Sequence, residues 1–410
     1  MPSYTVHTVI AASLYDNEVG RHLARASDGR LWCVFADKPA GYSNYQLFCA
    51  YSDNKGETWT EEQITTVDIS QYTVTVAIDS QDNLHIVYSG RGRQPYTSRN
   101  GIFYRKRTAT GWGTEETVAL KDVSGGQQSP SIAIDSGDNV HVDWYGKGWG
   151  TYPARNQIIY CKRTVIWGSP EEITSTDVSA YGEQYPAIAI DRQDNIHLTW
   201  QSTQAILNYT MVRYRKGIAG GWHTQEDVNT HDDGYAVSPR IALDSSDNIH
   251  IVWRDMLASE SWVAYNPKYR KRAIAGWGVT EDIATIAFSQ KDYLTIAIDS
   301  LDNAHVVWTG QGWGTNPSKY NIQYRKRTAS GWQTQEAITD EAVDHLGGSA
   351  LWANFPVISG VRTNIIHRDD FYIVYEKLGE AVMFYSKPTG ILGNPNVDQR
   401  IYQHAERMER

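Results

Sequence analysis

The sequence contains little cysteine, no long apolar run and no excess of positive charge. Three cysteines are too few for a disulfide framework. Cys33 and Cys49 could lie on neighbouring strands and pair, but we expect two ordinary buried thiols. No segment approaches the roughly 18 consecutive apolar residues of a membrane span, so we expect no membrane insertion. The first residues also lack the basic and apolar regions of a signal peptide.

The net charge is −9, from 38 basic and 47 acidic residues, which excludes a surface that coats nucleic acid. Trp (15) and Tyr (26) far outnumber Phe (7). Both side chains pair an apolar ring with a polar group, which suits contacts with sugars or with other proteins. Helical periodicity is absent, and so are a phosphate loop, zinc-ligand spacing and a dinucleotide-binding motif. We therefore expect no cofactor and no metal.

One phrase recurs through the chain: an apolar residue, Asp, two further residues, Asp-Asn, an apolar residue, His, and an aromatic residue three positions later. Five clear copies begin 56, 56, 53 and 55 residues apart: Ala77–Tyr88, Ala133–Trp144, Ala189–Trp200, Ala242–Trp253 and Ala297–Trp308. Degenerate copies at Arg21–Phe35 and Phe355–Tyr375 make seven units, which we number 1 to 7 in chain order. A repeat of this length indicates a solenoid or a propeller.

Each unit predicts four strands, a to d, with a tight Asp-Asn turn between strands a and b. Strand c has the pattern of 102–107, and a Gly-Trp turn such as Gly111-Trp112 precedes an acidic strand d. We predict a seven-bladed β-propeller over residues 1–390, with a peripheral tail at 391–410. Unit 7 lacks a strand d, so we expect the strand at 4–10 to complete it and close the ring.

Residues present in every unit are most simply structural. The recurring histidines (His85 and its counterparts) are spread around a ring and cannot converge on one metal ion. We expect the two recurring aspartates, Asp79 and Asp82 in unit 2, to accept backbone N–H bonds in turns. The Arg-Lys-Arg runs, such as 105–107, are each followed by an acidic strand d, so we expect cross-strand charge pairs rather than a nucleic-acid patch.

Unit 1 carries a turn that resembles the Asp-box (BNR repeat) of sialidase-like propellers. The matching residues are Ser52, Asp53, Asn54, Gly56, Thr58 and Trp59, with Asn54 where the family has aspartate. The resemblance implies fold rather than activity. Arg21 occupies the place of a sialidase arginine that clamps the substrate carboxylate. The next family motif survives only as Asp37-Lys38, and the other clamp arginines and the nucleophile pair are not evident.

Strand a should line the axis of such a ring. Alignment on the Asp-Asn turns places Thr75, Ser131, Ala187, Arg240 and Thr295 at one position, and counting back from Asp28 adds Arg21. Arginine is costly to bury unpaired and is the preferred partner of a carboxylate. One interpretation is an anionic-ligand pocket built by Arg21 and Arg240. The other is local pairing with Glu18 or Asp233.

The loops that precede strand a and those that join strands b and c should share one rim. We predict ligand binding there by Arg21, Arg240, Tyr72, Gln128, Tyr185, Tyr293, Trp352, Trp149 and Trp313. Trp149 and Trp313 lie in long glycine-rich loops, which suits sugar stacking, although they could equally brace neighbouring blades.

Three functions remain open, and the catalytic residues are unknown. The first is a carbohydrate-binding propeller, lectin-like or adhesin-like, with a glycan or polysaccharide partner. The second is an enzyme on acidic glycans, either a sialidase-like hydrolase or a uronate lyase with Tyr72, Tyr185, Tyr293 or His22 as the base. The third is a protein-binding scaffold. An extracellular or virion-associated location is favoured over the cytoplasm, with assembly into a larger surface or virion structure as one expectation.

Overall fold

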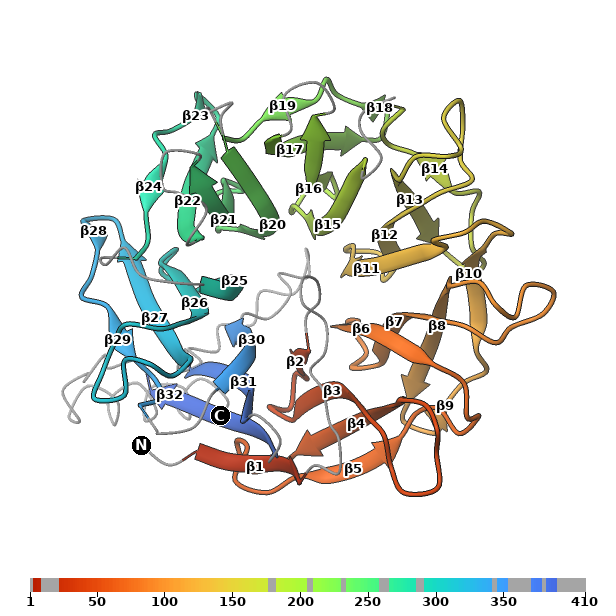
Figure 1. The fold of residues 1–410 in the computed structure, drawn as a ribbon, viewed down its shortest axis with the longest axis horizontal. Helices are drawn as coiled ribbons and strands as arrows, with labels where there is room; N and C mark the ends of the chain where they lie inside the picture. The colour runs from red at the N-terminus through yellow and green to blue at the C-terminus, as the bar shows by residue number, and fades with distance from the viewer. Residues whose placement is uncertain are drawn as a thin grey trace, which may run out of the picture.

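The computed structural model describes residues 3–8, 22–175, 182–204, 209–229, 234–257, 265–284, 291–340, 345–352, 370–377 and 381–388. Every element in this part of the chain is a β-strand. The strands form an all-β propeller, with their sheets arranged around one central axis (Figure 1). The tail at 391–410 lies outside the described residues.

One strand of each unit lies nearest the axis, as predicted for strand a (Figure 1). These inner strands are β2 (Leu23–Arg25), β6 (Gln71–Ile78), β11 (Gln127–Ile134), β15 (Glu183–Ile190), β20 (Gly234–Leu243), β25 (Lys291–Ile298) and β30 (His345–Trp352).

The second strands pair antiparallel with the inner ones and contribute large side chains to the core. They are β3 (Leu31–Asp37), β7 (Leu84–Gly90), β12 (Val140–Gly146), β16 (Ile196–Gln204), β21 (Ile249–Leu257), β26 (Ala304–Gly310) and β31 (Asp370–Lys377).

The third strands follow: β4 (Gln46–Ser52), β8 (Gly101–Thr108), β13 (Gln157–Arg163), β17 (Tyr209–Ile218), β22 (Asn266–Ala273), β27 (Asn321–Thr328) and β32 (Ala381–Pro388). The outer strands are short: β5 (Thr60–Gln63), β10 (Glu116–Leu120), β14 (Glu171–Glu172), β19 (Glu226–Asp227), β24 (Glu281–Asp282) and β29 (Glu336–Ala337). The Gly-Trp pairs form the two-residue strands β9 (Gly111–Trp112), β18 (Gly221–Trp222), β23 (Gly276–Trp277) and β28 (Gly331–Trp332).

Hydrogen bonds group these strands into six sheets rather than seven separate ones. The difference arises in units 4 and 5, where Thr210 of β17 and Tyr235 of β20 form a parallel bridge that joins two five-strand arrays into one ten-stranded sheet. The N-terminal strand β1 (Ser3–Thr8) pairs antiparallel with β32 of unit 7, as predicted. It thereby covers the edge that unit 7 would otherwise expose.

Apolar cores lie between successive units rather than within one. Trp144, Trp200, Trp253 and Trp308 are almost fully buried in these cores. The Gly-Trp indole of one unit packs edge-on against a tyrosine of the preceding unit, as Trp222 does on Tyr160 at 5.4 Å between ring centroids. The three cysteines are buried free thiols, so Cys33 and Cys49 do not pair.

The Arg-Lys-Arg runs also tie one unit to the next, which corrects the prediction of pairing with the following strand d. Arg107 of β8 forms an ion pair with Glu62 of β5, at 2.6 Å, and β5 belongs to the preceding unit. Arg272 does the same with Glu226 at 2.9 Å. The middle lysine turns inward: Lys106 contacts Asp79 within its own unit at 3.0 Å. The first arginine donates to backbone carbonyls, as Arg105 does to those of Gly113 and Ile64. The ion pair between units therefore belongs to the last arginine of each run, and the ion pair of the lysine stays within its own unit.

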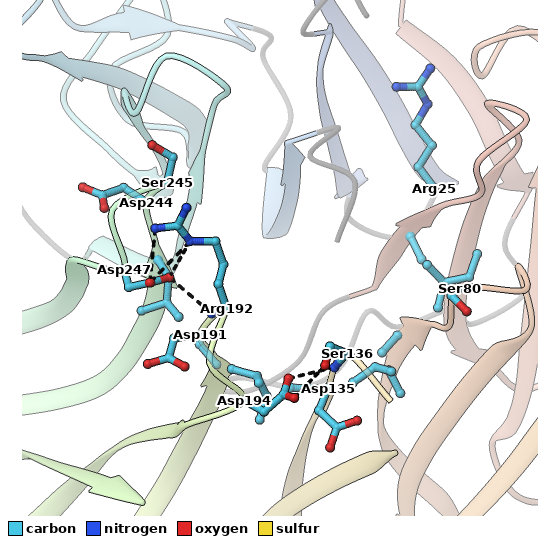
Figure 2. Close-up of a pocket in the computed structure, with 18 of the residues that line it drawn as sticks. Arg25, Ser80, Asp135, Ser136, Asp191, Arg192, Asp194, Asp244, Ser245 and Asp247 are labelled. Atoms are coloured by element: carbon cyan, nitrogen blue, oxygen red, sulfur yellow. Dashed lines mark hydrogen bonds and ion pairs between the residues drawn. The ribbon is translucent and has the colours of Figure 1, made fainter. Parts of the chain in front are cut away.

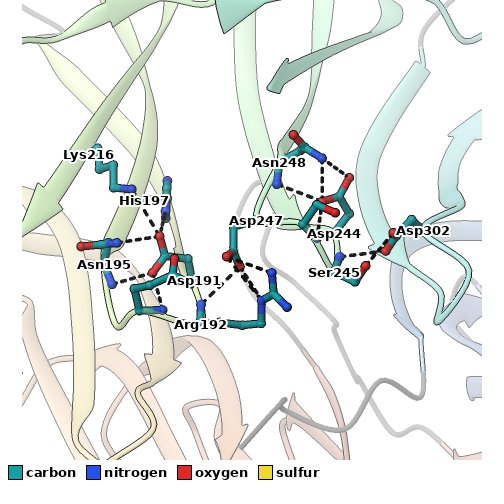
Figure 3. A network of polar contacts seen from close by, with 12 residues as sticks. Asp191, Arg192, Asn195, His197, Lys216, Asp244, Ser245, Asp247, Asn248 and Asp302 are labelled. Carbon is teal, nitrogen blue, oxygen red and sulfur yellow. Dashed lines mark hydrogen bonds and ion pairs between the residues drawn. The ribbon is translucent and has the colours of Figure 1, made fainter. Parts of the chain in front are cut away.

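A buried polar network repeats at the base of strand b in units 2 to 6. In unit 4, Asp191 accepts hydrogen bonds from the backbone and side-chain N–H groups of Asn195, both at 2.8 Å. The same carboxylate contacts His197 Nε2 at 3.1 Å and Lys216 Nζ at 3.3 Å (Figure 3). The histidine Nδ1 lies 2.8 Å from Tyr214 Oη. Each recurring histidine is therefore held inside its own unit, and the described residues contain no cluster that could hold a metal ion.

The second recurring aspartate links neighbouring units. Asp194 accepts the backbone N–H of Ser136 at 2.9 Å and its hydroxyl at 2.6 Å. Similar links join Ser27 to Asp82, Ser80 to Asp138 and Ser245 to Asp302, while Arg192 takes the serine's place opposite Asp247 (Figure 3). These aspartates accept backbone N–H bonds as predicted, but from the preceding unit.

The turn that resembles an Asp-box is held by its own side chains. Ser52 Oγ accepts the N–H of Gly56 at 2.8 Å, and Asn54 Oδ1 accepts the N–H of Thr58 at 2.9 Å. The indole of Trp59 donates to the carbonyl of Gly56 at 2.9 Å. Asp53 lies outside this arrangement and pairs with Arg30 at 2.6 Å. The asparagine thus fills the bonding role expected of it.

Candidate functional site

The inner strands run between two different ends of the central channel. At the loop end lie the connections into strand a and from strand b to strand c. At the turn end lie the Asp-Asn turns and the turns from strand c to strand d. The sequence-predicted ligand residues belong to the loop end, where the side chains differ from unit to unit. Trp352 is the exception, because unit 7 begins its inner strand at His345 and Trp352 ends that strand at the turn end.

Strand a is bulged near the loop end in units 2 to 6. In four of these units the bulge contains a residue with positive φ: Ser129 (48°), Tyr185 (51°), Ser238 (53°) and Tyr293 (52°). A bulky tyrosine rarely adopts this conformation, because its Cβ crowds the backbone. Bulges re-aim side chains and are frequent next to active sites. Two predicted ligand residues, Tyr185 and Tyr293, therefore lie in β-bulges with a backbone conformation that is unusual for tyrosine.

The register of unit 1 differs from the sequence alignment by one residue. Leu23 pairs with Cys33 and Arg25 with Leu31, as Val76 pairs with Ile86 and Ile78 with Leu84 in unit 2. His22, rather than Arg21, therefore matches Thr75 and Arg240. The alignment failed because Gly29, not Asp28, takes the positive-φ place of Asp82 in the turn. Arg21 itself lies outside the described residues.

His22 is buried, and its Nδ1 lies 3.1 Å from the carbonyl oxygen of Val34. Because a carbonyl only accepts, Nδ1 carries the proton and Nε2 keeps its lone pair. Burial lowers the pKa of His22 to about 4, and the positive charge of Arg240 contributes to this shift. The imidazole is thus neutral near pH 7 and lies within electrostatic reach of Arg240, which comes from unit 5.

Arg254 is a second arginine of unit 5 that the sequence reasoning missed. Its guanidinium donates to Ser238 Oγ at 2.7 Å and lies over the ring of Tyr265 at 5.1 Å. The backbone N–H of Ser238 donates to Gln201 of unit 4 at 3.3 Å. The other units carry Ser89, Tyr145, Gln201 and Thr309 at the Arg254 position, four residues after the recurring histidine. Comparing the units at this position in the sequence would have identified Arg254 as a departure from the repeat.

A tyrosine pair lies at the loop end of units 3 and 4. The ring of Tyr185 meets the ring of Tyr145 edge-on, at 5.4 Å between centroids. The hydroxyl of Tyr145 donates to Gln128 Oε1 at 3.1 Å, and Gln128 donates in turn to the carbonyl of Gly125. The structure thus brings predicted residues Gln128 and Tyr185 together through Tyr145, while Arg240 and Tyr293 come from units 5 and 6.

Trp149 and Trp313 pack against their own units. The indole N–H of Trp149 donates to Gln127 at 2.8 Å, and its ring lies 6.0 Å from that of Trp144. Trp313 has the same edge-on contact with Trp308, at 6.3 Å. Both indoles are half-buried, in contacts that brace the long loops. The side chains of Tyr72 and Trp352 lie outside the described part of the structure.

Comparison with known proteins identifies a fold but no family. No known family model matches this sequence, and no curated protein matches it either. Within the described residues, no helix is long and apolar enough to cross a membrane. Assignment to the Asp-box family therefore stays a prediction.

Several solved structures share the fold. A polysaccharide lyase, an ulvan lyase bound to -[GlcA(1-4)Rha3S]-, superimposes with a TM-score of 0.64 at 10% identity, covering 92% of this chain and 95% of its own. The polysaccharide lyase Uly1 superimposes with a TM-score of 0.53 at 11% identity, covering 90% of this chain and 89% of its own. A Dyadobacter fermentans protein of unknown function superimposes with a TM-score of 0.52 at 10% identity, covering 78% of this chain and 94% of its own. At these identities the likeness concerns the fold.

Proposed function

We propose that the loop end of the channel binds acidic glycans, and that the seven units form a seven-bladed ring around it. The observation that carries this proposal is the charge of unit 5. Arg240 and Arg254 stand at positions where other units have small or neutral residues. Guanidinium groups bind carboxylates and sulfates through paired hydrogen bonds. The tyrosines of units 3, 4 and 6 add apolar rings with hydroxyl groups, which suits sugar faces and edges.

The two lyases that share the fold give the ligand class a second support. One of them was solved with an oligosaccharide that contains GlcA, a sugar with a carboxylate. An arginine pair beside aromatic residues fits a chain of this kind. The carboxylate would meet the guanidinium groups, and the sugar rings would lie against Tyr145 and Tyr185.

A glycan-array screen with wild type and Arg240→Ala tests the proposal. We expect uronate-containing or sulfated glycans to bind, and the variant to bind about 10- to 100-fold more weakly, because a charge-assisted hydrogen bond is lost. Arg192→Ala is the matched control, since it removes an arginine at the turn end. Retained binding in Arg240→Ala, equal loss in the control, or no glycan binding would contradict the proposal, and the last outcome would favour a protein-binding scaffold.

A second candidate function is a uronate lyase, favoured by the positive φ of Tyr185 and Tyr293. In such a reaction a base removes the C5 proton, the C4–O bond breaks, a C4=C5 double bond forms, and the departing oxygen takes up a proton. Arg240 would neutralise the carboxylate. His22 is neutral but buried, so the tyrosines are better placed as the base.

Incubating the bound glycans with the protein separates these functions. Ultraviolet absorption from the new double bond, lost in Tyr185→Phe or Tyr293→Phe while binding persists, would establish the lyase. Saturated products would indicate the hydrolase, and no product would leave a glycan-binding protein.

A further inference from the structure

The opposite end of the channel contains a cavity that the proposed glycan site does not use. Its volume is about 480 Å³, within the range of roughly 300–1,000 Å³ common for small-molecule sites. The described residues that line it come from the inner strands and Asp-Asn turns of units 1 to 6. Figure 2 shows these residues converging on the cavity from several units.

The cavity wall is apolar. Residues at the ends of the inner strands line it, and those with large, partly exposed apolar side chains are Ile78, Ile134, Ile190 and Leu243. No aromatic residue occurs among the described residues that line the cavity. An aromatic cage of the kind that binds quaternary ammonium groups is therefore not what this wall provides. The chemistry of the wall suits the aliphatic hydrocarbon chain of a ligand.

The mouth of the cavity is acidic. Asp138, Asp194 and Asp302 each accept two hydrogen bonds from a serine of the preceding unit, which is a neutral donor. Each carboxylate therefore keeps its full negative charge and has lone pairs left for a ligand. Asp247 differs, because the guanidinium of Arg192 compensates its charge at 3.2 Å (Figure 2). Among the described lining residues, the three serine-bound aspartates are therefore the carboxylates paired with neutral donors alone.

The aspartates deeper in the cavity add little uncompensated negative charge. Asp135, Asp191, Asp244 and Asp299 also line the cavity, but each contacts a lysine of its own unit. Arg25 is the remaining cation among the described lining residues, and Figure 2 shows it apart from Asp194 and Asp247. The field at the mouth thus favours a positive charge beside Asp138 and Asp194, with the apolar wall directly behind it.

We propose that this turn-end cavity binds a primary alkylamine, with its ammonium group on the serine-bound carboxylates and its hydrocarbon chain against the inner strands. A primary ammonium has three N–H donors for these acceptors, whereas a quaternary ammonium has none. A neutral alcohol would keep the apolar contact and lose the charge. An alkanoate would place a negative charge beside three others.

Calorimetric titration and ligand-observed NMR with hexylammonium test the proposal, with hexanol, hexanoate and tetramethylammonium as comparison probes. We expect saturable binding of hexylammonium that is at least about fivefold tighter than that of each comparison probe. Asp194→Asn should weaken it about fivefold, because one charge is removed while an oxygen remains for Ser136. Asp122→Asn is the matched control, since Asp122 is an exposed aspartate of the loop end, paired with Arg99.

Filling the cavity provides an independent test. Ile190→Phe should abolish hexylammonium binding while glycan binding at the loop end persists. If that variant does not fold, Asp194→Asn and Asp138→Asn still decide the question. Equal binding of hexanol, binding unchanged in both aspartate variants, or no binding at millimolar concentration would overturn the proposal.

Discussion

At the turn end of the channel, units 2 to 6 carry the same Asp, Asn and His in the same hydrogen-bonded arrangement. At the loop end, the matching inner-strand position holds His22, Thr75, Ser131, Ala187, Arg240 and Thr295. The first set satisfies buried polar groups that units 2 to 6 share, so one solution serves all five. The second set lies along the inner strands, where no shared polar network requires one residue type. In a repeat protein, therefore, the shared residues reveal the fold and the departures from the repeat point to binding.

The strongest test of this comparison is to break one shared network. Asp191→Ala should lower the free energy of unfolding by about 3–5 kcal/mol, because His197, Asn195 and Lys216 lose their common acceptor. Denaturant titration measures the effect, and Asp244→Ala in unit 5 should match it. Asp194→Ala is the control at the exposed turn. If the free energy of unfolding fell by the same small amount in all three variants, the buried networks would not be a main source of stability.

The next largest effect on stability should come from protonation of His22, which belongs to unit 1. Its pKa is about 4 in the folded protein and about 6.5 when unfolded, so protons bind the unfolded chain first as pH falls. Its contribution to stability is complete above pH 6.5 and is lost between pH 6.5 and 4, about 3 kcal/mol in all.

The measurement is denaturant stability of wild type and His22→Gln at pH 7 and pH 4. The variant should lose about 3 kcal/mol less than wild type over this range. Burial also lowers the pKa values of four recurring histidines, His85, His141, His197 and His250, so part of the pH dependence of stability should persist in both proteins. Identical slopes would show that His22 is accessible to protons in the folded state.

Asp143 is a departure from the repeat inside the core rather than on the channel. It is fully buried, neither carboxyl oxygen has a well-aligned hydrogen-bond donor, and burial raises its pKa well above the usual range. Val87, Val252 and Val307 fill the matching positions. Asp143→Val should therefore stabilise the protein at pH 7 by about 2 kcal/mol.

The gain from Asp143→Val should depend on pH. Because the folded pKa is raised, wild type loses stability as pH rises above about 3.9, and the variant lacks this loss. Thr199→Val, at the same position in unit 4, is the control and should destabilise, since Thr199 donates to the carbonyl of Arg213 at 2.8 Å. A gain that stays constant between pH 4 and 8 would refute the assignment of a neutral acid.

The smallest effect should come from the links between turns. Ser80→Ala removes one hydroxyl that donates to Asp138 at 2.6 Å, in an exposed setting, and should lower stability by about 0.5 kcal/mol. Ser136→Ala should behave alike in thermal unfolding. A loss above about 2 kcal/mol would place the exposed links on a level with the buried networks.

Local pattern was sufficient for much of this protein. The period of the Asp-Asn turns, the alternation of strand b and the Gly-Trp pairs each depend on neighbours in the chain, so they predicted four strands per unit and structural histidines. The spare strand at the N-terminus also predicted its own partner, because unit 7 lacks a strand d and an open edge is unfavourable.

Tertiary structure decided what lies between units. Arg107 pairs with Glu62 of the preceding unit, Thr210 and Tyr235 merge two units into one sheet, and His22 takes the place expected for Arg21. The cavity at the turn end arises because inner strands from six units converge on one axis. Spacing along the chain carries the geometry of one unit, whereas contacts across the ring depend on how the units turn relative to one another, which no single repeat encodes.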